Sequence, residues 1–271
     1  MPYLDFRNKK IYYRIEGEGS PVILLHGFGE HGGIWKHQFE LLKESFLVIV
    51  PDLPGSGQSE LLDGDCSMED YAEVLKAIAD KELSENNAQS ISLIGHSMGG
   101  YIILAFLKKY ESLVNSFGLF HSSAFADNAE KISTREKGIE FILKNGALKY
   151  LETTVPNLFS EQSKRENPQI VKDLIQVACN LSANSLIQYM RAMITREDTT
   201  HILKTFEKPI LFIIGIHDNA VPLDTSLTQC HLSPVNTVHF LQKSGHVGMW
   251  EEKELCNKYL YNFLNSSAYS T

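Results

Sequence analysis

The feature of the sequence that most constrains the fold is a series of short, uninterrupted apolar runs separated by segments with helical periodicity. Runs of this length suit strands that are buried on both faces, as in a parallel sheet. Strands that alternate with helices are typical of βαβ units, so the sequence predicts an α/β fold with a mostly parallel sheet. The apolar runs cover residues 21–26, 46–50, 90–94, 117–120, 210–214 and 237–241.

Other segments supply the elements around these runs. Residues 3–16 alternate between polar and apolar side chains and are rich in Tyr and Ile, which predicts two antiparallel strands near the N-terminus. Ser67 and Asp70 form the pattern of a capping box, so we expect a helix to begin there. Further helices are predicted over residues 98–110 and 251–264.

Residues 124–205 interrupt this alternation, because they contain no strand pattern. Apolar side chains recur at helical spacing instead, from Leu174 to Met193. We expect a helical insertion after the sixth strand of the sheet that forms a cap, or lid, over the active site. The predicted core domain then consists of residues 1–123 and 206–271, and the predicted helical cap of residues 124–205.

The composition limits the classes of partner. The chain has 271 residues, of which 43% are hydrophobic, and its formal net charge is −8. Such a chain can form one large core. The acidic balance lacks the positive charge that neutralises phosphates, which disfavours binding to nucleic acids or to anionic membranes. We therefore expect a small-molecule substrate as the partner, and nothing in the sequence indicates the oligomeric state.

The cysteines and the apolar stretches indicate the cellular compartment. The four cysteines are widely spaced and form no C-x-x-C pair, which predicts reduced thiols and no structural zinc site. The N-terminal residues are charged and lack the apolar segment of a secretory signal. The longest apolar stretches are too short to span a bilayer, so we expect a soluble, cytoplasmic protein that holds no metal. The cysteines are Cys66, Cys179, Cys230 and Cys256.

A G-x-S-x-G motif, Gly95-His-Ser-Met-Gly99, connects a predicted strand to a predicted helix. This is the context of a nucleophile elbow, in which a strained turn exposes the serine. Side chains at Gly95 and Gly99 would collide with the neighbouring strand and helix. Ser97 is therefore the predicted nucleophile. The alternative interpretation is a glycine-rich helix start in which Ser97 only caps the helix.

A serine hydroxyl needs a base, and that base needs an acid to orient it. His246 lies between the last predicted strand and the final helix, and Asp218 follows the strand over residues 210–214. Both residues thus fall at the carboxyl edge of the sheet, where the sites of such folds form. Ser97, Asp218 and His246 are the predicted catalytic triad. The alternatives are a surface-loop histidine and an ordinary turn aspartate.

A tetrahedral oxyanion needs two backbone N–H donors that are already in place. Met98, which follows the predicted nucleophile, supplies one N–H group. The loop after the third strand contains His26-Gly-Phe-Gly29, and we expect Phe28 to supply the second. Phe28 and Met98 are therefore the predicted oxyanion hole.

Together these motifs resemble the capped α/β-hydrolase superfamily across nearly the whole chain. The order of nucleophile, acid and base is that of this fold and differs from other serine-triad folds. The resemblance implies an eight-stranded sheet, a helical cap and no cofactor. Haloalkane dehalogenases and epoxide hydrolases, which resemble this family, have an aspartate in place of Ser97. The motifs are His26-Gly-Phe-Gly29, Asp52-Leu-Pro-Gly-Ser-Gly-Gln-Ser59, Gly95-His-Ser-Met-Gly-Gly100, Asp218 with Val221-Pro222, and Gly245-His246.

The resemblance does not select a substrate, because the group includes carboxylesterases, acyl-carrier methyl esterases, thioesterases, C–C bond hydrolases and perhydrolases. The leading hypothesis is a serine hydrolase that cleaves a small or medium, mainly apolar carboxylic ester through an acyl-enzyme on Ser97. A C–C bond hydrolase of a vinylogous diketone would use the same triad. A third hypothesis, from another class, is a ligand receptor or binding module that keeps the hydrolase fold.

Aromatic and apolar side chains near the predicted site suggest the lining of the pocket. The expected substrate contacts are Phe120, Phe125, Tyr189 and Met193, with Phe28 and Phe159 nearby. His121 directly follows the sixth strand and is expected to pack or to form hydrogen bonds, so it is not included in the triad.

Overall fold

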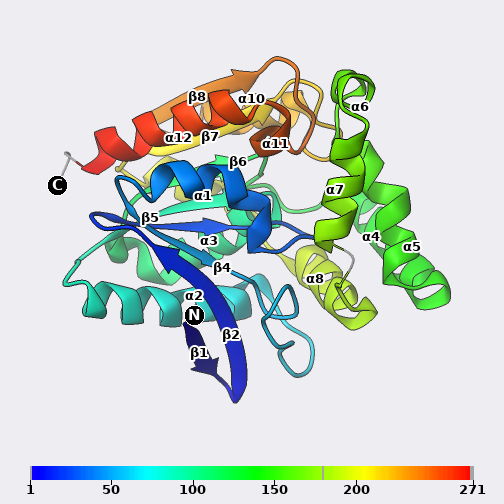
Figure 1. The fold of residues 1–271 in the computed structure, drawn as a ribbon, viewed down its shortest axis with the longest axis horizontal. Coiled ribbons are helices and arrows are strands. Elements are labelled where there is room, and N and C mark those ends of the chain that lie inside the picture. The colour runs from blue at the N-terminus through cyan, green and yellow to red at the C-terminus, as the bar shows by residue number, and fades with distance from the viewer. Residues whose placement is uncertain (1, 179, 269–271) are drawn as a thin grey trace.

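The computed structural model describes residues 2–178 and 180–268, which form one eight-stranded sheet with helices on both sides (Figure 1). The strand order is β1-β2-β4-β3-β5-β6-β7-β8. The β1–β2 and β2–β4 pairs are antiparallel and the other pairs are parallel, which confirms the predicted sheet. The strands are β1 (Tyr3–Phe6), β2 (Lys9–Glu16), β3 (Pro21–Leu25), β4 (Leu47–Pro51), β5 (Ile91–His96), β6 (Val114–Phe120), β7 (Ile210–Gly215) and β8 (Asn236–Leu241).

The central strands explain the apolar runs of the sequence. All residues of β3, β4, β5 and β7 are buried. Helices α1 and α12 lie on one side of the sheet, and α2 and α3 lie on the other (Figure 1). A strand covered on both faces has no solvent-facing side, so its sequence does not alternate.

The first two strands form a tight hairpin, as predicted. The turn residues Arg7 and Asn8 have φ values of 48° and 62°. Positive φ at both central residues defines the type I′ turn, whose twist matches that of the flanking strands.

Strand β6 begins at Val114, three residues before the run predicted from the sequence at 117–120. The added residues include Asn115 and Ser116, whose polar side chains hid the strand pattern. Ser92 Oγ on β5 donates to Asn115 Oδ1 at 2.8 Å and lies 2.9 Å from Ser116 Oγ. These hydrogen bonds between neighbouring strands satisfy polar groups that would otherwise be costly to bury.

Two of the predicted helices agree with the prediction, one in its N-terminal cap and the other in its two ends. The capping box of Ser67 and Asp70 begins α2, and α3 runs from Met98 to Tyr110. The predicted closing helix over 251–264 is divided instead into a short α11 and a longer α12. Glu252 breaks it with φ −129° and ψ 53°. The helices of this part of the chain are α1 (Lys36–Leu42), α2 (Met68–Glu85), α3 (Met98–Tyr110), α10 (Leu223–Cys230), α11 (Gly248–Glu251) and α12 (Lys253–Ala268).

The segment between β6 and β7 is a helical insertion without a strand in its described residues, 121–178 and 180–209. Helices α4 to α7 stand beside one end of the sheet, and α4 packs against α8 (Figure 1). We retain as a proposal the division into a core of 1–123 and 206–271 and a cap of 124–205. The helices are α4 (Ala129–Asn145), α5 (Ala147–Thr154), α6 (Glu161–Glu166), α7 (Gln169–Ala178), α8 (Ala183–Thr195) and α9 (Thr200–Thr205).

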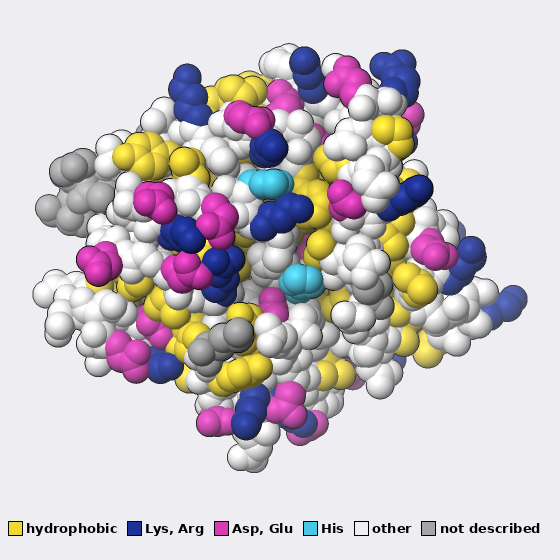
Figure 2. All heavy atoms as spheres, in the orientation of Figure 1, with side chains coloured by type: hydrophobic (Ala, Val, Ile, Leu, Met, Phe, Trp, Pro, Cys, Tyr) yellow, Lys and Arg dark blue, Asp and Glu magenta, His cyan; other side chains and the backbone are white. Residues whose placement is uncertain are grey.

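Three of the four cysteines lie in the described part of the chain. Cys66, Cys230 and Cys256 are buried and free, and Cys179 lies outside the described residues. Burial raises the pKa of the Cys66 and Cys230 thiols to about 11, so both are protonated at neutral pH. No helix in the described residues is long and apolar enough to cross a membrane. The face in Figure 2 carries acidic and basic side chains interspersed. A cytoplasmic location stays a prediction.

The capping box should contribute measurably to stability. Ser67 Oγ accepts the N–H of Asp70 at 3.2 Å, and Asp70 Oδ2 accepts the N–H of Ser67 at 3.0 Å. Ser67→Ala removes one of these bonds, so we expect the free energy of unfolding in urea to fall by about 1 kcal/mol. Ser84→Ala, at an exposed position of the same helix, is the control and should change it little. Equal values for both variants would contradict the role of the cap.

Candidate active site

Ser97 lies at a strained turn between β5 and α3. Its φ of 48° and ψ of −114° lie in a region that residues other than glycine rarely adopt. Neighbouring groups hold this conformation, because Ser97 N–H donates to Phe120 O at 2.9 Å and Ser122 Oγ donates to Ser97 O at 2.7 Å. A serine fixed in this way projects from the end of the strand, as a nucleophile elbow requires.

The two glycines of the motif are required by close backbone contacts. A Cβ at Gly95 would lie 2.5 Å from the backbone nitrogen of Gly100. A Cβ at Gly99 would lie 2.6 Å from the carbonyl oxygen of Leu25 on the neighbouring β3. Both contacts are shorter than any normal carbon contact, so the turn around Ser97 tolerates no side chain at either position.

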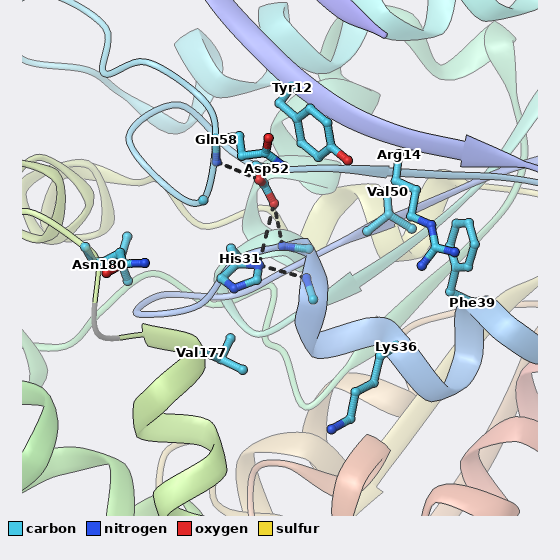
Figure 3. Close-up of a pocket in the computed structure, with 14 residues that line it drawn as sticks. Tyr12, Arg14, His31, Lys36, Phe39, Val50, Asp52, Gln58, Val177 and Asn180 are labelled. Carbon is cyan, nitrogen blue, oxygen red and sulfur yellow. Dashed lines mark hydrogen bonds and ion pairs between the residues drawn. The ribbon is translucent and has the colours of Figure 1, made fainter. Parts of the chain in front are cut away.

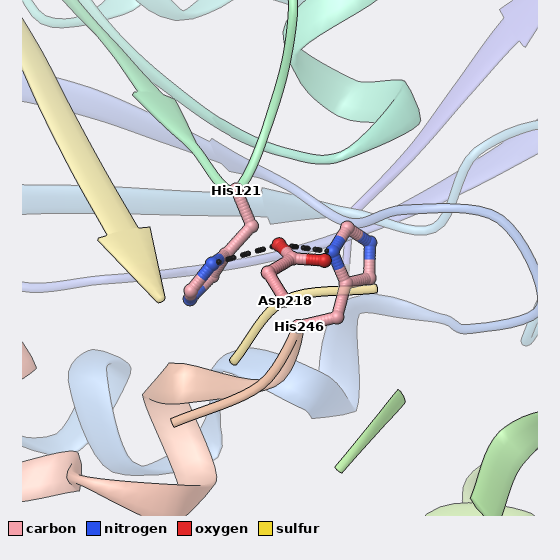
Figure 4. Close-up of side chains that lie close together, drawn as sticks. All are labelled: His121, Asp218 and His246. Carbon is pink, nitrogen blue, oxygen red and sulfur yellow. Dashed lines mark hydrogen bonds and ion pairs between the residues drawn. The ribbon is translucent and has the colours of Figure 1, made fainter. Parts of the chain in front are cut away.

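Asp218 and His246 are brought together from the loops after β7 and β8. His246 Nδ1 donates to Asp218 Oδ2 at 2.8 Å (Figure 4). Asp218 Oδ1 accepts the N–H groups of Ala220 and Val221, each at 2.8 Å. Burial opposes ionisation of Asp218, but His246 and the second histidine, His121, hold its pKa well below the usual range. Asp218 is therefore a carboxylate that fixes the His246 ring.

Ser97 and His246 line the same cavity, which has a volume of about 190 Å³. The insertion forms much of the wall opposite the sheet. The Ser97 hydroxyl has no hydrogen-bond partner among the described residues and is free to turn toward the His246 ring. The lining residues from the insertion are Arg135, Tyr150, Leu151, Thr154, Val155, Leu158, Leu174 and Met193.

The loop of Phe28 lies beside Ser97. A Cβ at Gly27 would lie 3.2 Å from Ser97 Cβ, so the loop approaches the serine closely. Gly29 has a φ of 74°, which suits glycine, and Phe28 lines the cavity. Neither Phe28 N–H nor Met98 N–H donates to another described residue. Both predicted oxyanion donors are thus unoccupied backbone groups.

His121 is a buried structural neighbour of the Asp218–His246 pair, as its position after β6 suggested. Its Nδ1 lies 3.2 Å from Asp218 Oδ2 and 3.2 Å from the backbone nitrogen of Gly215, and its Nε2 lies 3.2 Å from the backbone nitrogen of Gly248 (Figure 4). Burial lowers the pKa of His121 to about 4 in spite of Asp218, which agrees with a neutral ring.

Within the described residues, the same three side chains, His121, Asp218 and His246, are the group of potential metal ligands that lie close together. Tetrahedral Zn²⁺ at about 2.1 Å from each ligand keeps ligand atoms about 3.4 Å apart. The 2.8 Å between His246 Nδ1 and Asp218 Oδ2 is instead the length of a charge-assisted hydrogen bond. The cluster fits a hydrogen-bonded network better than a metal centre.

Only part of the predicted pocket lining is found in the cavity. Met193 lines it, whereas Phe120, Phe125 and Tyr189 are not among its lining residues. Phe120 is 1% exposed and packs in the core, and Phe125 lines a separate cavity. Tyr189 is fully buried, and its hydroxyl donates to Pro54 O at 2.7 Å. Helical spacing predicts which side chains share a face but not which way that face points.

The two remaining aromatic residues also differ in position. Phe28 lines the cavity, whereas Phe159 lines an open depression next to Asp218 on the other side of the loop. Arg135 and Tyr150 line the cavity, although the sequence did not single them out. Their only signal was a place in a predicted cap.

A larger cavity of about 340 Å³ lies away from these residues, between the sheet edge and the insertion (Figure 3). Two of its charged groups, Asp52 and Arg14, already have partners in the protein. Asp52 accepts the N–H groups of Gly32 and Gln58, each at 2.8 Å, and the Arg14 guanidinium lies 3.7 Å from the centre of the Phe39 ring. This cavity contains none of the predicted catalytic residues, so its greater size does not make it the active site.

A buried Glu30–His96 pair beside Ser97 was not predicted. The two side chains are 2% and 1% exposed, and His96 Nδ1 lies 3.0 Å from Glu30 Oε2. His96 Nε2 lies 2.8 Å from the carbonyl oxygen of His246. Both partners of the ring are acceptors, so each ring nitrogen must donate, which makes His96 an imidazolium. The pairing depends on β3 lying next to β5, which the local sequence does not reveal.

The ionisation of the pair follows from mutual stabilisation. Burial alone would lower the pKa of His96, but Glu30 raises it above the ordinary value of 6.5. Burial would raise the pKa of Glu30, but His96 lowers it. Glu30 Oε2 also accepts the N–H of Gly27 at 2.9 Å, so this ion pair connects the Phe28 loop to the His246 loop.

The His246 loop is also tied to the insertion. His246 N–H donates to Leu158 O at 2.6 Å. Glu251 accepts the N–H of Ser160 and that of Gly245, each at 2.9 Å, and therefore bridges the two segments. The sequence placed Glu251 only at the start of a helix, because a contact between remote loops leaves no local pattern.

Comparisons with known proteins place this geometry in a family. The model of the alpha/beta hydrolase fold family matches residues 20–166, just over half of the chain. The chain therefore belongs to the α/β-hydrolase family, as its motifs suggested. An esterase from Thermogutta terrifontis has a similar structure, with a TM-score of 0.90, 27% identity and coverage of 96% of this chain and 94% of that one.

Curated relatives include enzymes of two reaction types. The pimeloyl-[acyl-carrier protein] methyl ester esterase of Vibrio cholerae is 23% identical, over 93% of this chain and 97% of its own length. A 2-hydroxy-6-oxononadienedioate/2-hydroxy-6-oxononatrienedioate hydrolase of Paraburkholderia phymatum is 25% identical, over 94% and 91%. An uncharacterized protein of Mycobacterium tuberculosis is 33% identical over 117 residues, which span only 33% of that protein.

The charge state of His96 can be measured directly. In the wild type, the ring should be more than half protonated at pH 6.5, because Glu30 raises its pKa above that value. Glu30→Gln keeps an acceptor oxygen but removes the charge, so burial should then bring the pKa of His96 below 6.5. Ring ¹⁵N chemical shifts across a pH series report both values.

Glu40→Gln is the matched control, because Glu40 is an exposed glutamate that pairs with Arg14 and Lys43. It should leave the titration of His96 unchanged. A wild-type His96 ring that is mostly neutral at pH 6.5 would contradict the buried ion pair.

Proposed function

We propose that the protein is a serine hydrolase that cleaves carboxylic esters through an acyl-enzyme on Ser97. One observation carries the proposal: the strained Ser97 and the Asp218-bound His246 line one cavity, beside two backbone N–H groups that have no partner among the described residues. Each group meets one requirement of acyl transfer, namely nucleophile, oriented base and oxyanion donors. The family membership and the esterase among the similar structures support the same reaction class.

The first half-reaction forms the acyl-enzyme. His246 Nδ1–H donates a hydrogen bond to the Asp218 carboxylate, so Nε2 is the basic nitrogen that accepts the Ser97 proton. Ser97 Oγ attacks the ester carbonyl, and the N–H groups of Phe28 and Met98 bind the negative oxygen of the tetrahedral intermediate. The alkoxide leaves with the proton from His246 Nε2.

The second half-reaction releases the acid. A water molecule gives a proton to His246 Nε2 and attacks the acyl carbonyl, and the same two N–H groups hold the oxyanion. Collapse of this intermediate returns the proton to Ser97 Oγ and frees the carboxylic acid. Every step uses side chains and backbone groups of this chain, and the water is the only further reactant.

The cavity supports a small or medium acyl group. Its volume is about 190 Å³, and apolar side chains from the insertion line much of it. Apolar walls with a few polar groups are typical of small-molecule sites. The lining also contains Arg135, a charge that a purely apolar substrate would leave unused.

Cleavage of a C–C bond in a vinylogous diketone is a second candidate reaction. The observation in its favour is the Paraburkholderia relative, whose name describes a hydrolase of that type. Both reactions need the same base and oxyanion donors. Turnover of a dienone acid without turnover of simple esters would favour this reaction over ester hydrolysis.

Loss of the nucleophile tests the proposal. Ser97→Ala should reduce the kcat for p-nitrophenyl butyrate by at least about 10³-fold, because triad members act as one unit. The thermal unfolding temperature should change by no more than a few degrees. A fluorophosphonate should label the wild type at Ser97, as peptide mass spectrometry would show.

Ser84→Ala, at an exposed helix position, is the control and should retain full activity. An active Ser97→Ala variant would refute the assignment of the nucleophile. Labelling of Ser97 without turnover of any ester, thioester or diketone would instead support the binding-module hypothesis.

A further inference from the structure

One side chain in the wall of the active-site cavity carries a charge that the proposed ester chemistry does not use. Arg135, on α4 of the insertion, lines the cavity together with Ser97 and His246. Its side chain is 21% exposed. A guanidinium in the wall of a confined cavity is costly unless it is paired, so its partners determine what it can do.

Among the described residues, Arg135 has one carboxylate partner, Asp127, and it shares this partner with a second arginine. Arg135 Nε bonds Asp127 Oδ2 at 2.5 Å, and Arg196 Nη1 lies 2.7 Å from Asp127 Oδ1. The Asp127 side chain is fully buried. Two guanidinium groups and one carboxylate leave one positive charge uncompensated in this cluster.

The second arginine is fully engaged in the protein. Arg196 donates to the carbonyl oxygens of Met193 and Phe125, at 3.1 and 2.7 Å, and its guanidinium lies 4.0 Å from the centre of the Tyr101 ring. Its side chain is only 6% exposed. The uncompensated charge is therefore available at Arg135, whose Nη1 has no partner among the described residues.

No other carboxylate in the described cavity lining can neutralise Arg135. The lining contains a single acidic residue, Glu30, which is bound to His96. Two phenol groups, those of Tyr101 and Tyr150, line the cavity too, and neither hydroxyl bonds another described residue. Burial raises the pKa of Tyr150, so its hydroxyl remains a donor. Together these three side chains offer a positive charge and two O–H donors.

This group of donors is close to the reacting centre. Tyr101 follows Ser97 by four residues on α3, so it lies about one helical turn away. The Tyr150 ring meets the ring of Phe28, on the oxyanion loop, with 6.3 Å between ring centres. A short substrate bound at Ser97 can therefore reach Arg135.

We propose that Arg135, with Tyr101 and Tyr150, forms a carboxylate-binding subsite, so that the preferred substrates are short esters that carry a free carboxylate. The proposal rests on the proposed ester hydrolysis and adds the class of ester. Planar guanidinium groups bind carboxylates through paired N–H donors, and such bonds are stronger than neutral ones. The alternative role of Arg135 is purely structural, as an ion pair that holds α4 to Asp127.

Charge-matched esters distinguish these roles. Monomethyl succinate and monomethyl glutarate carry the carboxylate on the acyl part, and their dimethyl esters are the neutral counterparts. Acetoxyacetate carries it on the leaving group, and propyl acetate is its neutral counterpart. In at least one of the two series, the wild type should have a kcat/KM at least about 10-fold higher for the anionic ester.

Arg135→Gln should abolish that preference selectively. We expect kcat/KM for the preferred anionic ester to fall by about 10- to 100-fold, mainly through KM, because a charge-assisted hydrogen bond is lost. The neutral counterpart should change by less than about 3-fold. Arg135→Lys should recover part of the preference, because it keeps the charge without the planar donors.

Arg191→Gln is the matched control, because Arg191 is an exposed arginine on α8 that pairs with Asp65. This variant should leave kcat/KM unchanged for both the anionic and the neutral esters. Equal losses for anionic and neutral esters in Arg135→Gln would assign the residue a structural role and overturn the subsite. A wild type that hydrolyses esters with no preference for anionic ones would overturn it too, while the proposed ester hydrolysis would stand.

A binding measurement separates the subsite from the chemistry. Ser97→Ala should bind monomethyl glutarate or acetoxyacetate in calorimetry, and the double variant with Arg135→Gln should bind it at least about 10-fold more weakly. This result would support the subsite even if the wild type cleaved none of the esters, in which case the proposed ester hydrolysis would fail. Equal binding by the two variants would overturn the subsite.

Discussion

The hydrogen bonds of His246 connect the ends of two strands, β5 and β7, with the helical insertion. Its Nδ1 bonds Asp218 after β7, its carbonyl oxygen is bonded by His96 at the end of β5, and its N–H donates to Leu158 in the insertion. A general base works only when it is held within about 0.5 Å of its productive position. Because the partners come from remote segments, the ring is positioned only when the sheet and the insertion are both folded.

The polar groups beside Ser97 illustrate how a buried site remains stable. Glu30 and His96 neutralise each other, and Asp218 is bonded by two backbone N–H groups and by His246. Charges removed from water must be paired, since an isolated charge is costly. With these bonds in place, the Ser97 hydroxyl and the two oxyanion N–H groups, which the proposed reaction needs, have no partner among the described residues.

Local patterns predicted the features that depend on local geometry. The apolar runs gave the strands, the spacing around Ser97 gave the elbow, and positions after β7 and β8 gave Asp218 and His246. Contacts between remote segments could not be predicted in this way. The Glu30–His96 pair depends on the sheet order, and the lining of the cavity depends on how the insertion helices are rotated. Tyr189 shares a helix face with Met193 but bonds Pro54 instead of facing the cavity.

The candidate site residues therefore form two groups, which differ in how well the sequence predicts them. In the proposed mechanism, groups at the sheet edge carry out the reaction. Strand ends and tight turns constrain these groups, so a motif can reveal them. In the proposed subsite, groups from the insertion contact the rest of the substrate, and only helix packing constrains them, which accepts many sequences. Arg135 belongs to no motif, yet it lines the same cavity as Ser97, and the shared partner Asp127 leaves it a charge to offer a ligand. The proposed selectivity of this protein is therefore inferred from the unpaired polar groups in its cavity and not from its catalytic motifs.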